Sequence, residues 1–272
     1  MLKRTLVVLV LLPIGLFLIL LGGWAFAALI TLVLALAGWE YCQVFRVGGL
    51  KPAAAIVIGG IILFSLGRAQ NGFESSPVLL SLVILAAMAY HLVAFERGSD
   101  QAGTDFGVTL GGALYLGWIG AYLISVRNLP EGQWWLLLIL PAVWFADSAA
   151  YIVGSRIGKH KMAPRLSPKK SWEGYIAGVV FGTLGTALLA MLFQNYLKPD
   201  TAITPWIGLL LGFILSTLTT LGDLGESMIK RQVGVKDTGR LLPGHGGAFD
   251  RIDSWLWAAV LGYYLVSWLV YS

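Results

Sequence analysis

The sequence has little charge, almost no cysteine and few histidines, and each shortage excludes a class of protein. Only 12% of its 272 residues are charged, whereas 57% are hydrophobic and the mean hydropathy is +0.78, a value that soluble domains of this length rarely reach. The single cysteine, Cys42, excludes an intramolecular disulfide framework. With only three histidines beside it, the composition also argues against a zinc site. We therefore expect residues 1–272 to form one integral membrane domain.

Nine apolar runs fill most of the chain. They cover about 5–22, 24–42, 53–67, 77–95, 106–126, 133–153, 174–196, 204–230 and 254–271. Inside a bilayer the backbone must satisfy its own hydrogen bonds, so each run predicts a helix, and the alternation of a β-barrel is absent. We predict an all-α integral membrane protein with about nine transmembrane helices. Residues 1–130 would hold the N-terminal helices, and 131–272 the helices with the large polar loops.

The N-terminus imitates a secretory signal peptide. Lys3 and Arg4 precede an apolar core, and the sequence AFA at 25–27 resembles a cleavage site. Cleavage after Ala27 would leave the next run shorter than the about 20 residues that a helix needs to span a bilayer. The alternative that we favour is therefore a retained membrane helix.

Positive charge is distributed unevenly between the two sets of alternating loops. Of the 19 Lys and Arg residues, sixteen lie on the side of the N-terminus and of loops 43–52, 96–105, 154–173 and 230–253. The other three are Arg68, Arg127 and Lys198. The positive-inside rule places the N-terminus and the polar loops in the cytoplasm and the C-terminus outside. The net charge of +5 thus reports topology and does not indicate a nucleic-acid partner.

Carboxylates gather at the predicted cytoplasmic ends of the apolar runs. Asp147, Asp223 and Glu226 lie within runs, and Asp250 and Asp253 open the ninth. Acidic residues inside membrane segments are costly to bury and are functional candidates.

The eighth run has a polar face. Asp223, Glu226, Ser227 and Lys230 recur at i, i+3, i+4 and i+7, which places them on one side of a helix. Carboxylate and hydroxyl oxygens suit a hard cation such as Mg²⁺. The alternative is a structural ion pair of Lys230 with Asp223 or Glu226.

Two lysines and a glycine repeat lie around the start of the seventh run. In SPKKSWEG, Ser167 looks like a helix N-cap followed by proline at the first helical position, with Lys169 and Lys170 at the helix start. The lysines would either bind phosphates or anchor the chain to anionic lipid head groups. Glycines at 174, 178 and 182 predict close helix–helix packing.

The stretch VKDTGRLLPGHGGAFDRIDS, residues 235–254, has the composition of a phosphate-binding loop. Glycines let backbone N–H groups approach an anion, although the spacing is not that of a P-loop. His245 would contact a phosphate or sugar hydroxyl, or else brace the loop. Asp250 would bring a second carboxylate to the cation held by Asp223. Carboxylates approach phosphates through a bridging cation, as nucleotidyl transfer requires.

Residues 227–253, SMIKRQVGVKDTGRLLPGHGGAFDRID, closely resemble the signature of phosphatidate cytidylyltransferases, also called CDP-diacylglycerol synthases. In order they read S-x-I-K-R, K-D-x-G, L-P-x-H-G-G and D-R-I-D, and the stretches DSAAYIVGSRIGKHK and SPKKSWEG are also similar to the family. Ala248 departs from the pattern, because the family usually has a larger aliphatic residue there. The resemblance implies an enzyme of the cell (inner) membrane that joins CTP and phosphatidate into CDP-diacylglycerol and pyrophosphate with Mg²⁺. It further implies a homodimer and a polar cavity open to the cytoplasm.

The resemblance and the residue chemistry together suggest roles for the polar side chains. Asp223 and Asp250 would hold the cation with Asp147 and Glu226 around it, and the number of carboxylates is compatible with a second metal ion. The predicted catalytic set is Asp147, Asp223, Lys230 and Asp250. The predicted substrate-binding set is Ser167, Lys169, Lys170, Arg231, Lys236, Asp237, His245, Gly246, Gly247 and Arg251. For Asp237 and Arg251 the alternative role is to orient the loop only.

Three rival functions remain to be weighed. A transporter would place charges along a path across the membrane, whereas these cluster at one face, and duplicated halves are not evident. A lipid-alcohol kinase that uses CTP would share the Mg²⁺ and nucleotide contacts but release CDP. A CDP-alcohol phosphotransferase would show D-G-x2-A-R-x8-G-x3-D-x3-D, which this sequence lacks.

Overall fold

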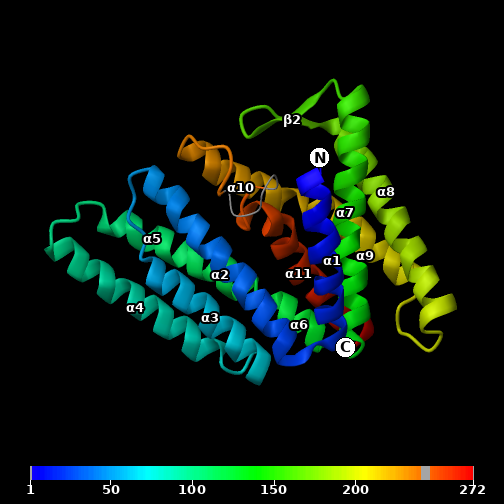
Figure 1. The fold of residues 1–272 in the computed structure, drawn as a ribbon, viewed down its shortest axis with the longest axis horizontal. Coiled ribbons are helices and arrows are strands. Elements are labelled where there is room, and N and C mark those ends of the chain that lie inside the picture. Colours follow the sequence, from blue (N-terminus) through cyan, green and yellow to red (C-terminus); the bar gives the residue numbers. More distant parts are fainter. Residues whose placement is uncertain (1, 240–245, 272) are drawn as a thin grey trace. The chain divides into compact units, whose positions relative to one another are not determined.

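The structure, a computed structural model, describes residues 2–239 and 246–271, with the backbone alone for residues 2–11. Its described part is almost entirely helical, with one two-stranded sheet (Figure 1). Seven helical segments of the described chain are long and apolar enough to cross a membrane. The predicted all-α, multi-pass membrane class is confirmed. The described residues form nine helical segments, the predicted number, when 102–128, 172–197 and 205–232 are each counted as one segment.

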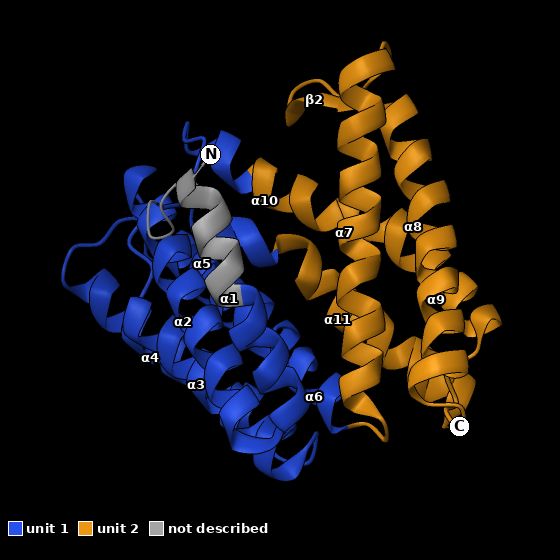
Figure 2. Ribbon diagram, turned by 45° about the vertical axis from the view of Figure 1, so that its right-hand side comes forward, with its two compact units in different colours: residues 1–128, 229–252 blue, residues 129–228, 253–272 orange. Residues whose placement is uncertain are grey.

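The chain forms two compact units (Figure 2). Unit 1 comprises residues 1–128 and 229–252, and unit 2 comprises residues 129–228 and 253–272. The division at 128 lies close to the predicted one at 130. The stretch 229–252, however, belongs with the N-terminal helices, although it is distant from them in the sequence.

Unit 1 is built from the N-terminal helices. Their bounds are α1 (Leu2–Leu21), α2 (Gly23–Val47), α3 (Ala54–Asn71), α4 (Ser76–Glu96), α5 (Ala102–Gly112), the π-helix η1 (Ala113–Ile119) and α6 (Tyr122–Asn128). Gly22, with φ 69°, separates α1 from α2. Arg127 of α6 donates through Nε to the carbonyl oxygen of Ile19 at 2.6 Å, which ties α6 to the last turn of α1. The short apolar run 53–67 forms helix α3, which has 18 residues.

A buried arginine lies within unit 1. Arg68, near the end of α3, is only 2% exposed. Its guanidinium carbon lies 3.6 Å from the ring centre of Phe73 and 4.8 Å from that of Trp118, and it donates to Ser125 Oγ at 2.9 Å. Aromatic faces attract a cation, so this cage offsets part of the penalty for burying the charge.

Unit 2 contains the remaining helices and the sheet. Its elements are α7 (Gly132–Ile157), β1 (Lys161–Ala163), β2 (Ser167–Ser171), α8 (Trp172–Leu192), η2 (Phe193–Leu197), α9 (Pro205–Leu218), the first part of α10 (Thr220–Gln232) and most of α11 (Phe249–Val270). The helices α7 and α8 pack side by side (Figure 1). The eighth apolar run is therefore two helices, since it breaks at Thr219.

Small residues let α8 approach its neighbours closely. A Cβ added at Gly178 would lie 2.9 Å from the carbonyl oxygen of Ala146 in α7. A Cβ at Gly182 would collide with Oγ of Ser216 in α9 and lie 3.1 Å from Cβ of Ala146 in α7. The predicted packing role of the glycine repeat is confirmed.

The predicted N-cap at Ser167 is wrong. Residues 167–171 form strand β2, which pairs antiparallel with β1, and the helix begins only at Trp172. Its N-cap is Ser171, whose Oγ accepts the N–H of Gly174 at 3.3 Å. Both strands of a two-stranded sheet are edges, so Pro168 is tolerated there without a backbone N–H.

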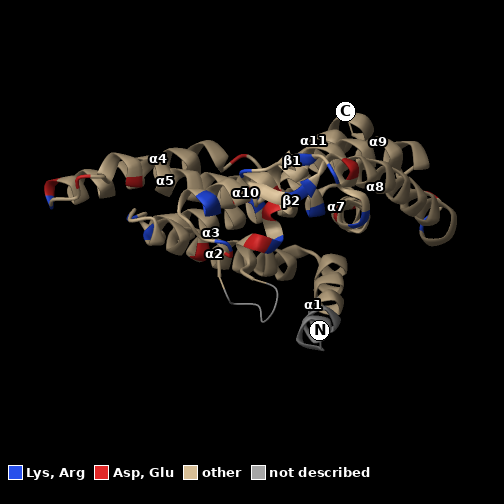
Figure 3. Ribbon diagram, turned by 90° about the horizontal axis from the view of Figure 1, so that it is seen from above, with Lys and Arg blue, Asp and Glu red and all other residues tan. Residues whose placement is uncertain are grey.

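Large apolar side chains cover the outside of several helices. On α4, Leu82, Leu85 and Leu92 are 53%, 66% and 59% exposed. Such surfaces are expected where helices face lipid, because the bilayer replaces a protein core as the apolar partner. Most of α8 and α9 is likewise free of charge, whereas basic residues occupy the β1–β2 hairpin (Figure 3).

Candidate active site

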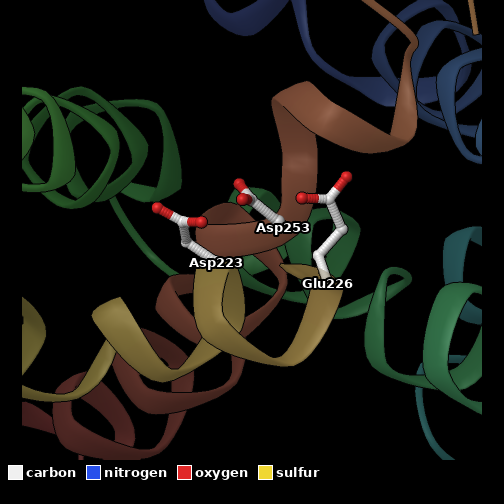
Figure 4. Close-up of side chains that lie close together, drawn as sticks. All are labelled: Asp223, Glu226 and Asp253. Carbon is white, nitrogen blue, oxygen red and sulfur yellow. The ribbon is translucent and has the colours of Figure 1, made fainter. Parts of the chain in front are cut away.

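Three carboxylates of unit 2 point toward one another (Figure 4). Asp223 and Glu226 come from α10 and Asp253 from α11, and one oxygen of each lies within 4.8 Å of the others. Glu226 is buried, whereas the two aspartates are partly exposed. Carboxylate oxygens are the hard ligands that Mg²⁺ prefers, so this donor set fits that ion.

The glycine before Asp223 explains why the cluster forms. Asp223 and Glu226 are three residues apart and therefore neighbours on the helix surface. A Cβ at Gly222 would collide with the carbonyl oxygen of Asp253 and lie 2.8 Å from Cδ1 of Trp257. Only glycine allows α11 to approach α10 so closely, and this brings the Asp253 carboxylate beside the other two.

A lysine and a fourth carboxylate complete the charged region of unit 2. Lys170, near the end of β2, places its Nζ 2.6 Å from Oδ2 of Asp223. Asp147 of α7 interacts electrostatically with Lys170 and Asp223. Asp253 interacts electrostatically with Lys170, Asp223 and Asp147. Carboxylate oxygens from three helices, α7, α10 and α11, meet in this region, and such hard ligands suit a divalent cation.

A second charged cluster lies in unit 1, around Asp250. Lys230 Nζ lies 2.7 Å from Asp250 Oδ1. The other oxygen, Oδ2, accepts the N–H of Gly247 at 2.8 Å, the N–H of Thr238 at 3.1 Å and the hydroxyl of Thr238 at 2.9 Å. Asp250 thus organises the glycine-rich segment on both sides of residues 240–245. Its predicted role as a metal ligand stays a prediction.

Sequence reasoning missed one acidic residue of this cluster. Glu40 of α2 has no exposed surface, and its Oε2 accepts the N–H of Phe249 at 2.9 Å. It lies inside the apolar run 24–42. An acidic residue within an apolar run is the signal that identified Asp147, and it should have identified Glu40 too. Asp253 was noted only as the start of a helix, yet it belongs to the carboxylate cluster.

The other predicted site residues are placed as follows. Exposed side chains belong to Lys169, Arg231, Lys236, Asp237 and Arg251, and Ser167 is partly buried in β2. Gly246 adopts a φ of 79°, which favours glycine, and Gly247 is buried. His245 lies outside the described residues. The structure therefore gathers Asp147, Lys170, Asp223 and Glu226 in unit 2, and Lys230, Gly247 and Asp250 in unit 1.

Comparison with known proteins identifies the family. Residues 2–269 match the model of the cytidylyltransferase family. A phosphatidate cytidylyltransferase of Synechocystis is 34% identical over 92% of this chain and 90% of the relative, and one of Bacillus subtilis is 35% identical over 93% and 92%. A phosphatidate cytidylyltransferase of Mycobacterium tuberculosis strain H37Rv is 43% identical over 55% of this chain and 43% of the relative. The chain belongs to the cytidylyltransferase family, as its signature segment, residues 227–253, led us to expect.

Proposed function

We propose that the carboxylate cluster of unit 2 lies at the centre of the reaction by which the relatives are named. The chain transfers CMP from CTP to phosphatidate and so makes CDP-diacylglycerol and pyrophosphate for phospholipid synthesis. The observation that carries the residue assignment is the convergence of Asp223, Glu226 and Asp253 within 4.8 Å of one another.

The proposed cofactor is Mg²⁺. Asp223, Glu226 and Asp253 would hold it, with Asp147 close by, and their oxygen donors support the assignment. When bound, the ion would withdraw charge from the triphosphate of CTP. The ion pair of Asp250 with Lys230 and its hydrogen bonds favour a role in shaping the glycine-rich segment. Direct metal binding by Asp250 stays a prediction.

The chemistry needs no nucleophile from the protein. An oxygen of the phosphatidate phosphate attacks the α-phosphorus of CTP, a new P–O bond forms, and the bond to the β-phosphate oxygen breaks to release pyrophosphate. A phosphate monoester has its second pKa near 6, so this oxygen is already mostly deprotonated at neutral pH. The protein's task is to bring two polyanions together and to stabilise the charge on the leaving group.

Basic residues would perform that task. Lys170 is held beside the carboxylate cluster by Asp223, and Lys169 precedes it in β2. We assign both to the substrate phosphates. Lys230, Arg231 and Lys236 belong to the signature segment, and we assign them, with the glycines at 246 and 247 and His245, to CTP or the departing pyrophosphate.

The finer statements about assembly and location are also proposals. We propose a homodimer in the cell (inner) membrane, with the N-terminus and active site in the cytoplasm and the C-terminus outside. The orientation rests on sixteen of the 19 Lys and Arg residues lying on the side of the N-terminus. Cytoplasmic CTP would then reach the acidic cluster directly.

The direct test uses purified protein in detergent with phosphatidate, Mg²⁺ and CTP labelled at the α-phosphate. We expect label to enter a lipid-extractable product only when both phosphatidate and Mg²⁺ are present. A folded protein that transfers no label from α-labelled CTP, but transfers γ-label to a long-chain alcohol, would instead be a lipid kinase.

Asp223→Asn tests the assignment of the cluster. Removing one carboxylate charge should lower kcat at least about 100-fold and weaken Mg²⁺ binding, because the cation loses a ligand and Lys170 its partner. Turnover is measured across a Mg²⁺ titration, and Mn²⁺ binding by electron paramagnetic resonance. The matched control is Asp200→Asn, an exposed aspartate in the same unit. Near-normal turnover of Asp223→Asn with an unchanged Mg²⁺ dependence would remove the cluster from the mechanism.

A further inference from the structure

A carboxylate with no exposed surface lies within a candidate membrane helix of unit 1. Glu40 belongs to α2, whose residues Gly23–Val47 are long and apolar enough to cross a bilayer. Burying a carboxylate is costly unless hydrogen bonds or charges compensate for the lost water. The mechanism proposed above does not use Glu40, so its presence needs another explanation.

The hydrogen bonds of Glu40 lead to two points of the signature segment. Oε2 accepts the backbone N–H of Phe249 at 2.9 Å and faces the hydroxyl of Thr238 at 3.3 Å. These two residues lie on either side of the glycine-rich stretch. Among the described residues, Oε1 has no hydrogen-bond partner. The side chain therefore links the beginning and the end of the stretch that contains the most specific motif of the sequence.

Two glycines of the motif are shaped around the same carboxylate. The three atoms nearest to a Cβ added at Gly239 all belong to Glu40: it would collide with Oε1 and lie 2.8 Å from Cδ and 3.3 Å from Cγ. A Cβ at Gly247 would collide with Oε2 of Glu40 and with the hydroxyl of Thr238. Neither glycine has a positive φ, so space and not backbone conformation excludes a side chain at these positions.

Thr238 connects Glu40 to Asp250. Its hydroxyl lies 3.3 Å from Glu40 Oε2 and 2.9 Å from Asp250 Oδ2, and its single proton can serve only one of them at a time. The shorter distance favours Asp250, which in turn pairs with Lys230. Glu40, Thr238, Asp250 and Lys230 thus form a continuous polar network inside unit 1.

We infer that Glu40 is a positioning residue that holds residues 238–239 and 246–249, the two described ends of the signature stretch, in the arrangement that binds CTP. The inference rests on the proposed function, since it assigns the signature segment to the nucleotide. Glu40 itself touches no substrate: it acts by fixing the backbone at Phe249 and, through Thr238, the orientation of Asp250.

The test compares Glu40→Ala with Glu40→Gln in the full-length protein. Glu40→Ala removes the acceptor of the Phe249 N–H, and we expect KM for CTP to rise about tenfold, the effect of losing one hydrogen bond to a charged group, while KM for phosphatidate stays within about twofold. Glu40→Gln keeps an acceptor oxygen and should recover most of the CTP affinity. The control is Glu96→Ala, which removes an exposed carboxylate from α4 of the same unit.

Hydrogen–deuterium exchange provides a readout that needs no catalysis. Peptides that contain the amides of Thr238 and Phe249 should exchange at least about tenfold faster in Glu40→Ala than in the parent protein, because the Phe249 N–H loses its acceptor and Thr238 loses its contact with Glu40. Peptides from α3 and α4 should exchange at unchanged rates. A rise in exchange throughout the protein would mean that Glu40 serves general stability only, and would overturn the inference.

A double variant tests the link to Gly239. Gly239→Ala alone should lower kcat/KM for CTP about tenfold, because its new methyl group collides with Glu40. In the Glu40→Ala background the same change should lower it less than about twofold, because the obstacle has been removed. If the loss of kcat/KM in the double variant equalled the product of the losses in the two single variants, the inference would be contradicted. If the parent protein transfers no cytidylyl group while Glu40→Ala still releases the segment in the exchange experiment, the proposed function fails and the positioning role stands.

Discussion

Individual charged residues in this apolar protein are held by partners within their own unit. Arg68 is enclosed by aromatic rings, Glu40 accepts a backbone N–H, and Asp223 pairs with Lys170. The cause is the high cost of a bare charge in a low-dielectric environment, which makes each partner necessary. The spacing of Asp223 and Glu226 was visible in the sequence because it depends on helix periodicity alone. The approach of Asp253 was not, because it depends on how α11 packs against Gly222.

A residue-scale prediction concerns the ion pair before α7. The Glu131 carboxylate lies 2.6 Å from Lys198 Nζ and 2.6 Å from the hydroxyl of Thr201. Burial alone would raise the pKa of Glu131. The hydrogen bonds from Lys198, Thr201 and the Ala202 N–H, together with the positive charge of Lys198, outweigh burial and lower the pKa. A lowered pKa in the folded state stabilises the protein above the unfolded value of about 4.3, and this contribution disappears as the pH falls through the lower, folded value.

We therefore expect Glu131→Gln to lower the melting temperature in detergent by about 2–4 °C at pH 7, a modest effect because the pair is partly exposed. The difference from the parent protein should shrink as the pH falls below about 4. Glu74→Gln, at an exposed glutamate, is the control and should melt like the parent at every pH. A deficit for Glu131→Gln that is independent of pH would show that the ion pair is not its source.

At the scale of helices and strands, apolar runs predicted most of the architecture. The runs predicted the helical segments because membrane burial leaves the backbone few alternatives to a helix. The β1–β2 hairpin was missed, because Ser167 and Pro168 have the local pattern of a helix start and only pairing with residues 161–163 reveals the strand. Similarly, α11 begins at Phe249, five residues earlier than the apolar run, since Asp250, Arg251 and Asp253 interrupt the apolar pattern at its start.

The glycine repeat of α8 gives an element-scale prediction. In Gly178→Ala the new Cβ would lie 2.9 Å from the carbonyl oxygen of Ala146 and 3.2 Å from Cβ of Ala150, which forces α7 and α8 apart. The change should destabilise the protein by about 1–3 kcal/mol, as overpacking does. Gly107→Ala in α5 is the matched control, because nothing lies within 4 Å of its new Cβ, and it should be neutral or slightly stabilising. Thermal melting in detergent distinguishes the two, and equal melting temperatures would refute the packing role.

For the whole molecule, the orientation in the membrane connects the helices to function. Cys42 is the one cysteine of the sequence and it is buried, so a Cys42→Ala background gives a clean system for labelling introduced thiols. We expect an impermeant maleimide to label Asp200→Cys in intact cells and Asp100→Cys only after lysis. The reverse pattern would invert the orientation. Labelling of both positions from one side would contradict the predicted three crossings between them.

The assignment of residues 229–252 to unit 1 also bears on how such proteins can be recombined. The sequence of unit 1 is interrupted by one hundred residues, 129–228, that belong to unit 2. A chimaera joined at residue 128 would therefore combine the Glu40 of one parent with the Thr238 and Phe249 of the other. The buried Glu40 would then depend on hydrogen-bond donors from a protein whose α2 differs. Exchange between homologues should succeed only when 1–128 and 229–252 come from the same parent, so these two stretches are expected to be inherited together.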